Sequence, residues 1–205
     1  ANIKKSYLQS ILRDAVSKSF NMIDVDGDQS TNDTVLIFAN AAAGAPEIQE
    51  DSDASRSFIE AVEYVCTELA KELVRDGEGA QRLIEVTVDG AETISEARSA
   101  AREIASSLLV KAMVHGRDPN WGRLVMALGK SGINLNESKI DIFISNIHIV
   151  SGGVAIPYYK DAVVSAMSAD EIQFRIALDV GDATATAWGC DLTEEYVIFN
   201  SAYST

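Results

Sequence analysis

The order of helical and strand-like periodicity along the chain is the feature that most constrains its fold. Apolar residues recur at helical spacing over residues 6–20, 54–74 and 93–113. The last third instead alternates apolar and polar residues, most regularly over residues 172–180. This order is typical of an α+β protein whose antiparallel or mixed sheets are sandwiched by helices. We expect a helix-rich part over residues 1–130 and a sheet-rich part over residues 131–205, packed as one compact unit.

Two of the predicted helices begin at a recognisable capping signal. Ser6 and Thr93 stand three residues before Gln9 and Glu96, which is the spacing of a capping box. In that motif the hydroxyl and the carboxylate or amide satisfy backbone N–H groups that the first helical turn leaves free. Each helix is therefore predicted to begin directly after its hydroxyl residue.

Three shorter segments give predictions about strands. The apolar run at residues 34–39 is β-prone and predicts a mostly buried strand, although the alanines that follow leave a helix open. The alternation of isoleucines changes phase at residues 145–146, which predicts a β-bulge. Residues 195–199 are expected to form a final strand that leads into a polar tail.

Composition and charge exclude several classes of protein. The 205 residues are 47% hydrophobic and 23% charged, an ordinary balance for a globular protein. A formal net charge of -14 argues against nucleic acid or an anionic membrane as the main partner. No apolar run approaches the roughly 20 residues that span a bilayer. Cys66 and Cys190 lie in a helical and a strand pattern, so a disulfide is open but two buried thiols in a reducing compartment are favoured.

Residues 23–34 form the most polar turn of the chain, and its spacing can be tested against a calcium loop. Asp24, Asp26 and Asp28 occupy the first, third and fifth places of such a loop. The sixth place needs glycine but holds Gln29, and the twelfth needs a bidentate glutamate but holds Val35. We therefore predict no metal site here, and interpret the stretch as a turn whose side chains bond to nearby backbone groups.

Four other places could bind a ligand or could be purely structural. Glu78 stands between two glycines, which suits a solvated turn or a carboxylate presented to a ligand. Lys111 lies near a helix end, where it could complement the helix dipole or bind phosphate or carboxylate. Residues 115–123 either lock a turn or recognise an anion at a helix start. His115 and His148 are the two histidines, and neither lies in a recognisable nucleophile turn.

Several stretches resemble motifs of one family, the ornithine acetyltransferases (glutamate N-acetyltransferases), and they occur in the family's order. The matching stretches are residues 25–34 (Val-Asp-Gly-Asp-Gln-Ser-Thr-Asn-Asp-Thr), 76–80 (Asp-Gly-Glu-Gly-Ala), Lys111, residues 118–123 (Asp-Pro-Asn-Trp-Gly-Arg), and 187–193 continuing to Asn200. The resemblance implies the fold shared by this family and by N-terminal-nucleophile-like aminopeptidases. It also implies a ping-pong transfer of acetyl from N2-acetylornithine to L-glutamate in arginine biosynthesis, without a bound cofactor. Some members use acetyl-CoA as well.

The resemblance also implies partners and site residues. Members of the family are made as one precursor that cuts itself before a threonine, and this sequence resembles the β chain, which joins an α chain in an α2β2 heterotetramer. Glu78 matches a substrate-contacting glutamate whose charge suits the ammonium end of ornithine. Asn200 and Thr205 match a C-terminal pair that binds the substrate. The expected location is the cytoplasm in bacteria, or the mitochondrial matrix if the source is eukaryotic.

The catalytic residue of the family has no counterpart in this sequence. The family's nucleophile is the threonine at the start of the β chain, with its own α-amine, of pKa ~8, as a plausible base. This sequence begins with Ala1, so no residue takes that role, and we expect the threonine upstream of Ala1. The alternatives are a related N-terminal-nucleophile aminopeptidase and a non-catalytic subunit that binds an amino acid.

Overall fold

A computed structural model describes residues 1–202 and divides the chain into two compact units. The first contains residues 1–21 and 29–70, and the second contains residues 22–28 and the chain from residue 71 onward. Helix α2 (Asp53–Arg75) begins in the first unit and ends in the second. None of the helices in residues 1–202 combines the length and the apolar composition needed to cross a membrane.

The first unit is built on two amphipathic helices, as predicted. Helix α1 (Lys5–Lys18) contributes Ile11 and Ala15, and α2 contributes Val62 and Cys66, to a small buried cluster. The predicted capping box at Ser6 is wrong. The helix begins at Lys5, two residues earlier than predicted, and its N-cap residue Lys4 makes no side-chain cap bond. Tyr7, in the first turn, packs against the buried cluster.

The predicted buried strand at residues 34–39 is also wrong. Leu36 is 69% exposed and Phe38 is 86% exposed, and no strand or helix is assigned to the segment. A strand needs a neighbour whose backbone groups pair with its own. Within residues 1–202 no strand lies beside this segment, so its β propensity has nothing to pair with.

The second unit is organised around one mixed seven-stranded sheet with the strand order β1-β7-β2-β6-β3-β4-β5. Strand β2 runs parallel to β6 and antiparallel to β7, while β1 runs parallel to β7. The strands are β1 (Ile23–Asp24), β2 (Leu83–Ala91), β3 (Asp141–Ile144), β4 (Ile147–Ser151), β5 (Val154–Ala155), β6 (Glu171–Ala177) and β7 (Ala183–Cys190). A mixed sheet combined with helices confirms the predicted α+β class.

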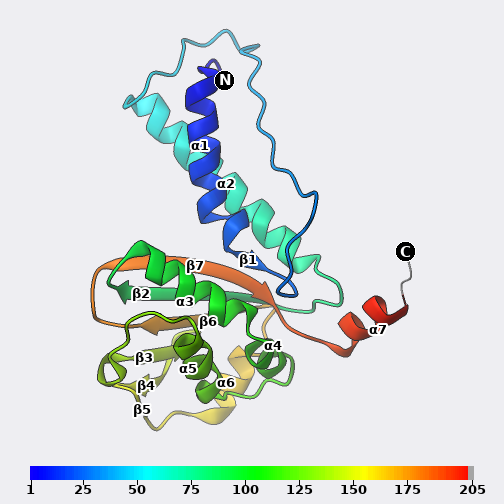
Figure 1. The fold of residues 1–205 in the computed structure, drawn as a ribbon, viewed down its shortest axis with the longest axis vertical. Helices are drawn as coiled ribbons and strands as arrows, with labels where there is room; N and C mark the ends of the chain where they lie inside the picture. Colours follow the sequence, from blue (N-terminus) through cyan, green and yellow to red (C-terminus); the bar gives the residue numbers. More distant parts are fainter. Residues whose placement is uncertain (203–205) are drawn as a thin grey trace. The chain divides into compact units, whose positions relative to one another are not determined.

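Helices cover one face of this sheet at close range (Figure 1). Helix α3 (Ile94–Ser106) packs on β2 and β7, with α4 (Leu108–His115) and α5 (Trp121–Lys130) beside it. A Cβ atom at Gly189 would lie 2.7 Å from the carbonyl oxygen of Ala105, so the approach of α3 to β7 requires glycine there. The buried alanines of α3 serve the same close packing.

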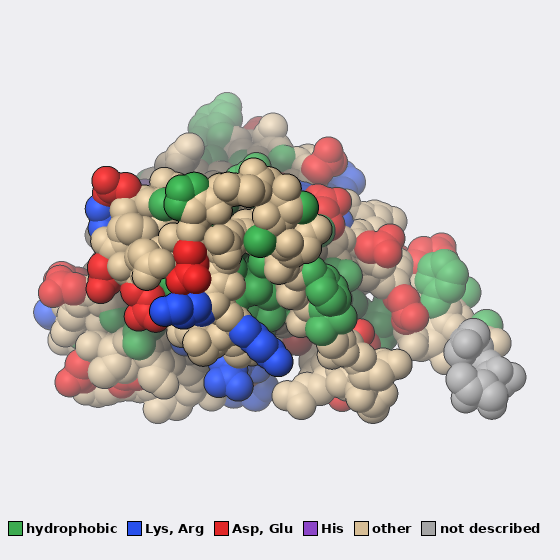
Figure 2. Space-filling model, turned by 90° about the horizontal axis from the view of Figure 1, so that it is seen from above, with side chains coloured by type: hydrophobic (Ala, Val, Ile, Leu, Met, Phe, Trp, Pro, Cys, Tyr) green, Lys and Arg blue, Asp and Glu red, His purple; other side chains and the backbone are tan. Residues whose placement is uncertain are grey.

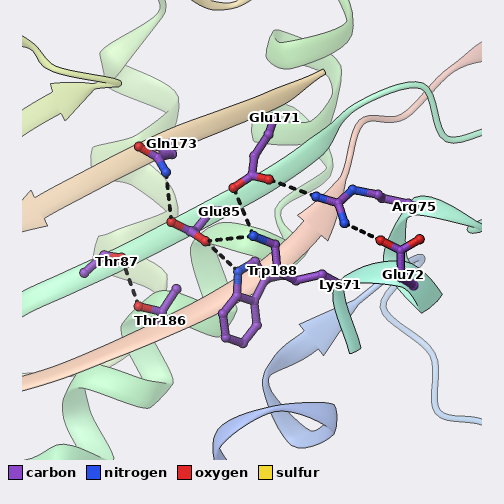
Figure 3. Close-up of polar contacts among 9 residues, drawn as sticks. All are labelled: Lys71, Glu72, Arg75, Glu85, Thr87, Glu171, Gln173, Thr186 and Trp188. Atoms are coloured by element: carbon purple, nitrogen blue, oxygen red, sulfur yellow. Dashed lines mark hydrogen bonds and ion pairs between the residues drawn. The ribbon is translucent and has the colours of Figure 1, made fainter. Parts of the chain in front are cut away.

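The opposite face of the sheet carries a polar network that fastens the last turn of α2 (Figure 3). The ammonium nitrogen of Lys71 lies 3.1 Å from Glu171 and 3.7 Å from Glu85. Arg75 lies 2.9 Å from Glu171, and the indole nitrogen of Trp188 donates to Glu85 at 2.8 Å. These charges are only partly exposed, so each carboxylate keeps a partner from a different element.

Two further differences concern turns and the C-terminal segment. Residues 145–146 form the turn of the β3–β4 hairpin, with Ser145 at φ 52, and the register shift lies instead beside Ile142. The predicted final strand at residues 195–199 is wrong, because these residues belong to helix α7 (Glu194–Ala202). Glu194 and Glu195 in its first turn favour a helix start by complementing the helix dipole.

The remaining elements are short. They are the 3-10 helices Phe20–Met22 and Glu137–Lys139 and the helix α6 (Lys160–Ala166). The predicted helix over residues 93–113 is divided into α3 and α4 at Ser107, whose backbone is extended. Acidic side chains are spread over the face drawn in Figure 2, in keeping with the net charge.

We predict that Thr93→Ala destabilises the second unit by about 1 kcal/mol. The Thr93 hydroxyl accepts from the Glu96 amide at 3.2 Å and the Glu96 carboxylate accepts from the Thr93 amide at 3.1 Å, so the capping box predicted here is formed. Urea unfolding followed by circular dichroism measures the change. Ser107→Ala is the control, because Ser107 is the N-cap of α4 but makes no side-chain cap bond. Equal losses in both variants would contradict the role of the box.

Candidate functional site

The loop at residues 76–80 presents Glu78 at the end of α2. Its backbone closes on itself, with the amide of Gly77 donating to Val74 at 3.2 Å and the amide of Ala80 donating to Gly77 at 2.9 Å. Gly79 adopts a φ of +72, in the left-handed region that favours glycine. The loop therefore turns sharply on either side of Glu78 and leaves that carboxylate exposed.

Helix α7 lies directly against this loop. A Cβ atom at Gly79 would meet the amide nitrogen of Tyr196 at 2.6 Å, which is closer than any side chain can approach. The buried hydroxyl of Thr193 donates to the carbonyl oxygen of Gly79 at 2.7 Å. The backbones of the two segments thus lie in close contact, and Gly79 is required on steric as well as conformational grounds.

Two of the predicted substrate-binding residues meet at this contact. The side-chain amide of Asn200 donates to the Glu78 carboxylate at 2.6 Å and to the carbonyl oxygen of Tyr196 at 3.0 Å. Glu78 and Asn200 are 122 positions apart in the sequence, and both are exposed. Thr205, the third residue of the predicted set, lies outside the described residues. An exposed carboxylate beside an amide suits a ligand that carries an ammonium group and polar head groups.

A buried aspartate that sequence analysis did not single out holds the far end of the loop. Asp191 directly follows β7, and its carboxylate accepts from the amides of Gln81 and Arg82 at 2.8 and 2.9 Å. The Arg82 guanidinium lies 3.4 Å from the same carboxylate, which is fully buried. The only signal was its place in the stretch of residues 187–193, where an aspartate after a predicted strand is easily taken for a turn residue.

Lys111 binds a carboxylate, as one of its two sequence-based interpretations predicted, but that carboxylate belongs to the protein itself. The lysine side chain is fully buried, and its nitrogen lies 3.0 Å from the Asp24 carboxylate and donates to the carbonyl oxygens of Val25 at 2.8 Å and Cys190 at 3.2 Å. It therefore binds an internal carboxylate and backbone, and is not available to an external phosphate. Its position inside α4 also separates it from the helix end.

The side chains of the polar turn at residues 23–34 form hydrogen bonds with neighbouring backbone groups and with α7. The Asp26 carboxylate accepts from the Asp28 amide at 3.0 Å and from the Tyr196 hydroxyl at 3.2 Å. Ser30 accepts from the amide of Asp33 at 3.2 Å. Hydrogen bonds from side chains to nearby backbone groups are what the interpretation as a polar turn predicted. Within residues 1–202, no three histidine, cysteine, aspartate or glutamate side chains are grouped so that they could hold a metal ion.

Burial and charge set the protonation of two groups at the site. Burial raises the pKa of the Tyr196 phenol, and the charge of Asp26 and its hydrogen bond raise it further, so Tyr196 stays a donor at neutral pH. Burial also raises the pKa of the Cys190 thiol, against the opposing charge of Lys111. Cys190 is thus a neutral thiol, and both Cys66 and Cys190 are free and buried as predicted.

The two histidines and the turn at residues 115–123 have structural roles. His115 lies 3.7 Å from Asp191 and 3.2 Å from Glu194, so it joins α4 to the start of α7. His148 stacks on Phe143 at 4.3 Å between ring centroids, on the polar sheet face. The Arg123 guanidinium donates to the carbonyl oxygen of Leu109 at 3.2 Å, which favours the interpretation of a locked turn.

We predict that Gly79→Ala destabilises the second unit more than Gly132→Ala does. Both glycines have a φ of +72, but a Cβ atom at Gly132 meets nothing within 4 Å, so the control isolates the clash from the backbone strain. Backbone strain alone costs about 1 kcal/mol in either variant, and Gly79→Ala adds at least about 1 kcal/mol of overpacking. Equal losses in urea unfolding would show that α7 does not press on the loop.

Comparison with known proteins shows that the chain is similar to ArgJ proteins. The chain is 45% identical over all of its 205 residues to the "Arginine biosynthesis bifunctional protein ArgJ" of Symbiobacterium thermophilum, and covers 51% of that protein. It is 43% identical over the same span to the ArgJ protein of Staphylococcus epidermidis, and covers 52% of it. The chain thus spans about half the length of the curated relatives it matches.

A solved structure and a family model extend this similarity to the fold and the whole chain. The crystal structure of the ArgJ protein from Bacillus halodurans superposes with a TM-score of 0.97 at 39% identity, covering 99% of this chain and 96% of that one. This confirms the expected fold. The ArgJ family model matches residues 1–205. The chain therefore belongs to the ArgJ family.

Proposed function

We propose that this chain is the β chain of an acetyltransferase of arginine biosynthesis, which moves an acetyl group from N2-acetylornithine to L-glutamate. The observation that carries the proposal is the hydrogen bond between Glu78 and Asn200. These residues were assigned to the substrate by family resemblance alone, and they are brought together across 122 positions. The relatives are named arginine biosynthesis bifunctional protein, which supports the same pathway.

Residues of this chain bind the substrate. The Glu78 carboxylate pairs with the side-chain ammonium of ornithine, because both groups are charged at neutral pH and the carboxylate is exposed. Asn200 and Thr205 bind the amino-acid head group by hydrogen bonds. No bound cofactor is needed, and acetyl-CoA serves as a second acetyl donor in a bifunctional enzyme.

The covalent side of the reaction requires a threonine upstream of Ala1. Its hydroxyl attacks the acetyl carbonyl of N-acetylornithine while its α-amine takes the proton. The C–N bond breaks, ornithine leaves with that proton on its amine, and the acetyl group remains as an ester on threonine. The amine of glutamate then attacks the ester, which forms N-acetylglutamate and regenerates the hydroxyl. Donors from the α chain stabilise the oxyanion in both steps.

The lengths of the matching chains support a partner made from the same precursor. The curated relatives are about twice as long as this chain, yet the ArgJ chain in the solved structure is covered to 96% by it. The chain in that solved structure thus has nearly the extent of this one. We propose that the other half is an α chain, that cleavage before the threonine separates the two, and that they assemble as α2β2 in the cytoplasm.

We predict that Glu78→Gln raises KM for N-acetylornithine by about 10- to 100-fold, because a charge-assisted contact is worth about 1.5–3 kcal/mol. Glutamine keeps an oxygen that can accept from Asn200, so the loop is preserved and the charge alone is lost. Steady-state acetyl transfer by the assembled enzyme measures the effect. Glu92→Gln is the matched control, since Glu92 is an exposed glutamate on the loop between β2 and α3.

Three results would redirect the proposal. An unchanged KM in Glu78→Gln would remove Glu78 from the substrate site. Release of an amino acid from peptides, without acetyl transfer, would indicate the related aminopeptidase. Binding of ornithine by the assembled protein without either reaction would indicate a non-catalytic subunit.

A further inference from the structure

Lys111 is a buried cation whose contacts all lie on segments beside the site. A buried ammonium is costly unless it is paired and its donors are used. Its nitrogen meets three carbonyl oxygens, those of Asp24, Val25 and Cys190, together with the Asp24 carboxylate. One side chain on α4 thus holds the end of β1, the residue after it and the end of β7.

Each of these anchored segments supports the Glu78 loop. The support comes either from the anchored residue itself or from the residue next to it in the chain. A Cβ atom at Gly77 would lie 3.0 Å from the Val25 side chain, so Val25 forms the floor of the loop. Asp26, next to Val25, accepts from the Tyr196 hydroxyl of α7. Asp191, next to Cys190, accepts from the amides of Gln81 and Arg82.

We propose that Lys111 is a positioning residue for the substrate pair Glu78 and Asn200, which rests on the proposed function. By fixing residues 24–26 and the end of β7, it sets the floor and the far end of the Glu78 loop. Through Asp26 and Tyr196 it also sets the first turns of α7, whose Asn200 bonds to Glu78. Lys111 does not touch the substrate and acts only through these segments.

A purely structural role would not need a charge at this place. An apolar side chain of similar volume fills buried space at lower electrostatic cost. The charge adds only the hold on the carbonyl oxygens and on Asp24. The proposal therefore expects a local loosening when the charge is removed, rather than a general loss of packing.

The test uses the assembled enzyme with Lys111→Met, Tyr196→Phe and a control, Lys130→Met. Lys130 pairs with Glu103 at 2.7 Å, and the Lys130 side chain is 78% exposed. Tyr196→Phe removes one link without leaving a buried charge unpaired. If Lys111→Met alone does not fold because Asp24 is left unpaired, the double variant with Asp24→Asn removes that charge and still frees both segments.

Two readouts separate positioning from stability. The first readout is hydrogen exchange of four amides: Gly77, bonded to the end of α2, Ala80, bonded within the loop, and Gln81 and Arg82, bonded to Asp191. Their exchange should be about tenfold faster in Lys111→Met, with the central strands unchanged. KM for N-acetylornithine should rise about tenfold with kcat nearly constant, as expected when uniform binding is lost. Tyr196→Phe should shift KM in the same direction by a smaller factor.

Unchanged exchange at these four amides, with a lower unfolding free energy alone, would overturn the proposal. The exchange measurement does not depend on the reaction. If the unmodified enzyme transfers no acetyl group, the proposed function fails. Faster local exchange in Lys111→Met would still support the role of Lys111 in fixing the loop, and unchanged exchange would still overturn it. Lys130→Met should match the unmodified enzyme in both readouts.

Discussion

The buried carboxylate of Asp191 is the interaction on which the arrangement of the second unit and its site depends. It joins the end of β7 to the start of β2 by accepting from two consecutive backbone amides, and it pairs with Arg82. Loss of this fully buried carboxylate would take the acceptor from two partly buried amides and from a guanidinium, which costs more than a missing surface contact. The loop that presents Glu78 begins at one end of this junction, and helix α7, which presents Asn200, begins at the other.

Periodicity predicted the elements that bury one regular face. The helices α1 and α2 and the strand β6 follow from the spacing of apolar residues, and Thr93 with Glu96 marks the start of α3 correctly. These features are local, because the residues that decide them lie within a few positions of each other. Ser6 was misleading because its helix starts earlier than its capping signal.

The remaining features depend on partners that the sequence does not identify. Residues 34–39 have strand propensity but no neighbouring strand, and residues 195–199 are too short a run to distinguish a strand from a helix. The burial of Lys111 depends on Asp24 and Cys190, which are 87 and 79 positions away. For the site, Glu78 and Asn200 came from family resemblance, whereas their contact and the support by Asp191 and Tyr196 required the fold.

The central proposal is that this chain belongs to an acetyltransferase whose binding residues lie on this chain and whose nucleophile precedes Ala1. The most direct test is the intact mass of the chain in the native assembly after incubation with N-acetylornithine and no acceptor. The account predicts a chain that begins with threonine upstream of Ala1 and gains the mass of one acetyl group, which glutamate then removes. A chain whose native N-terminus is Ala1, or one that never gains an acetyl group, would contradict it.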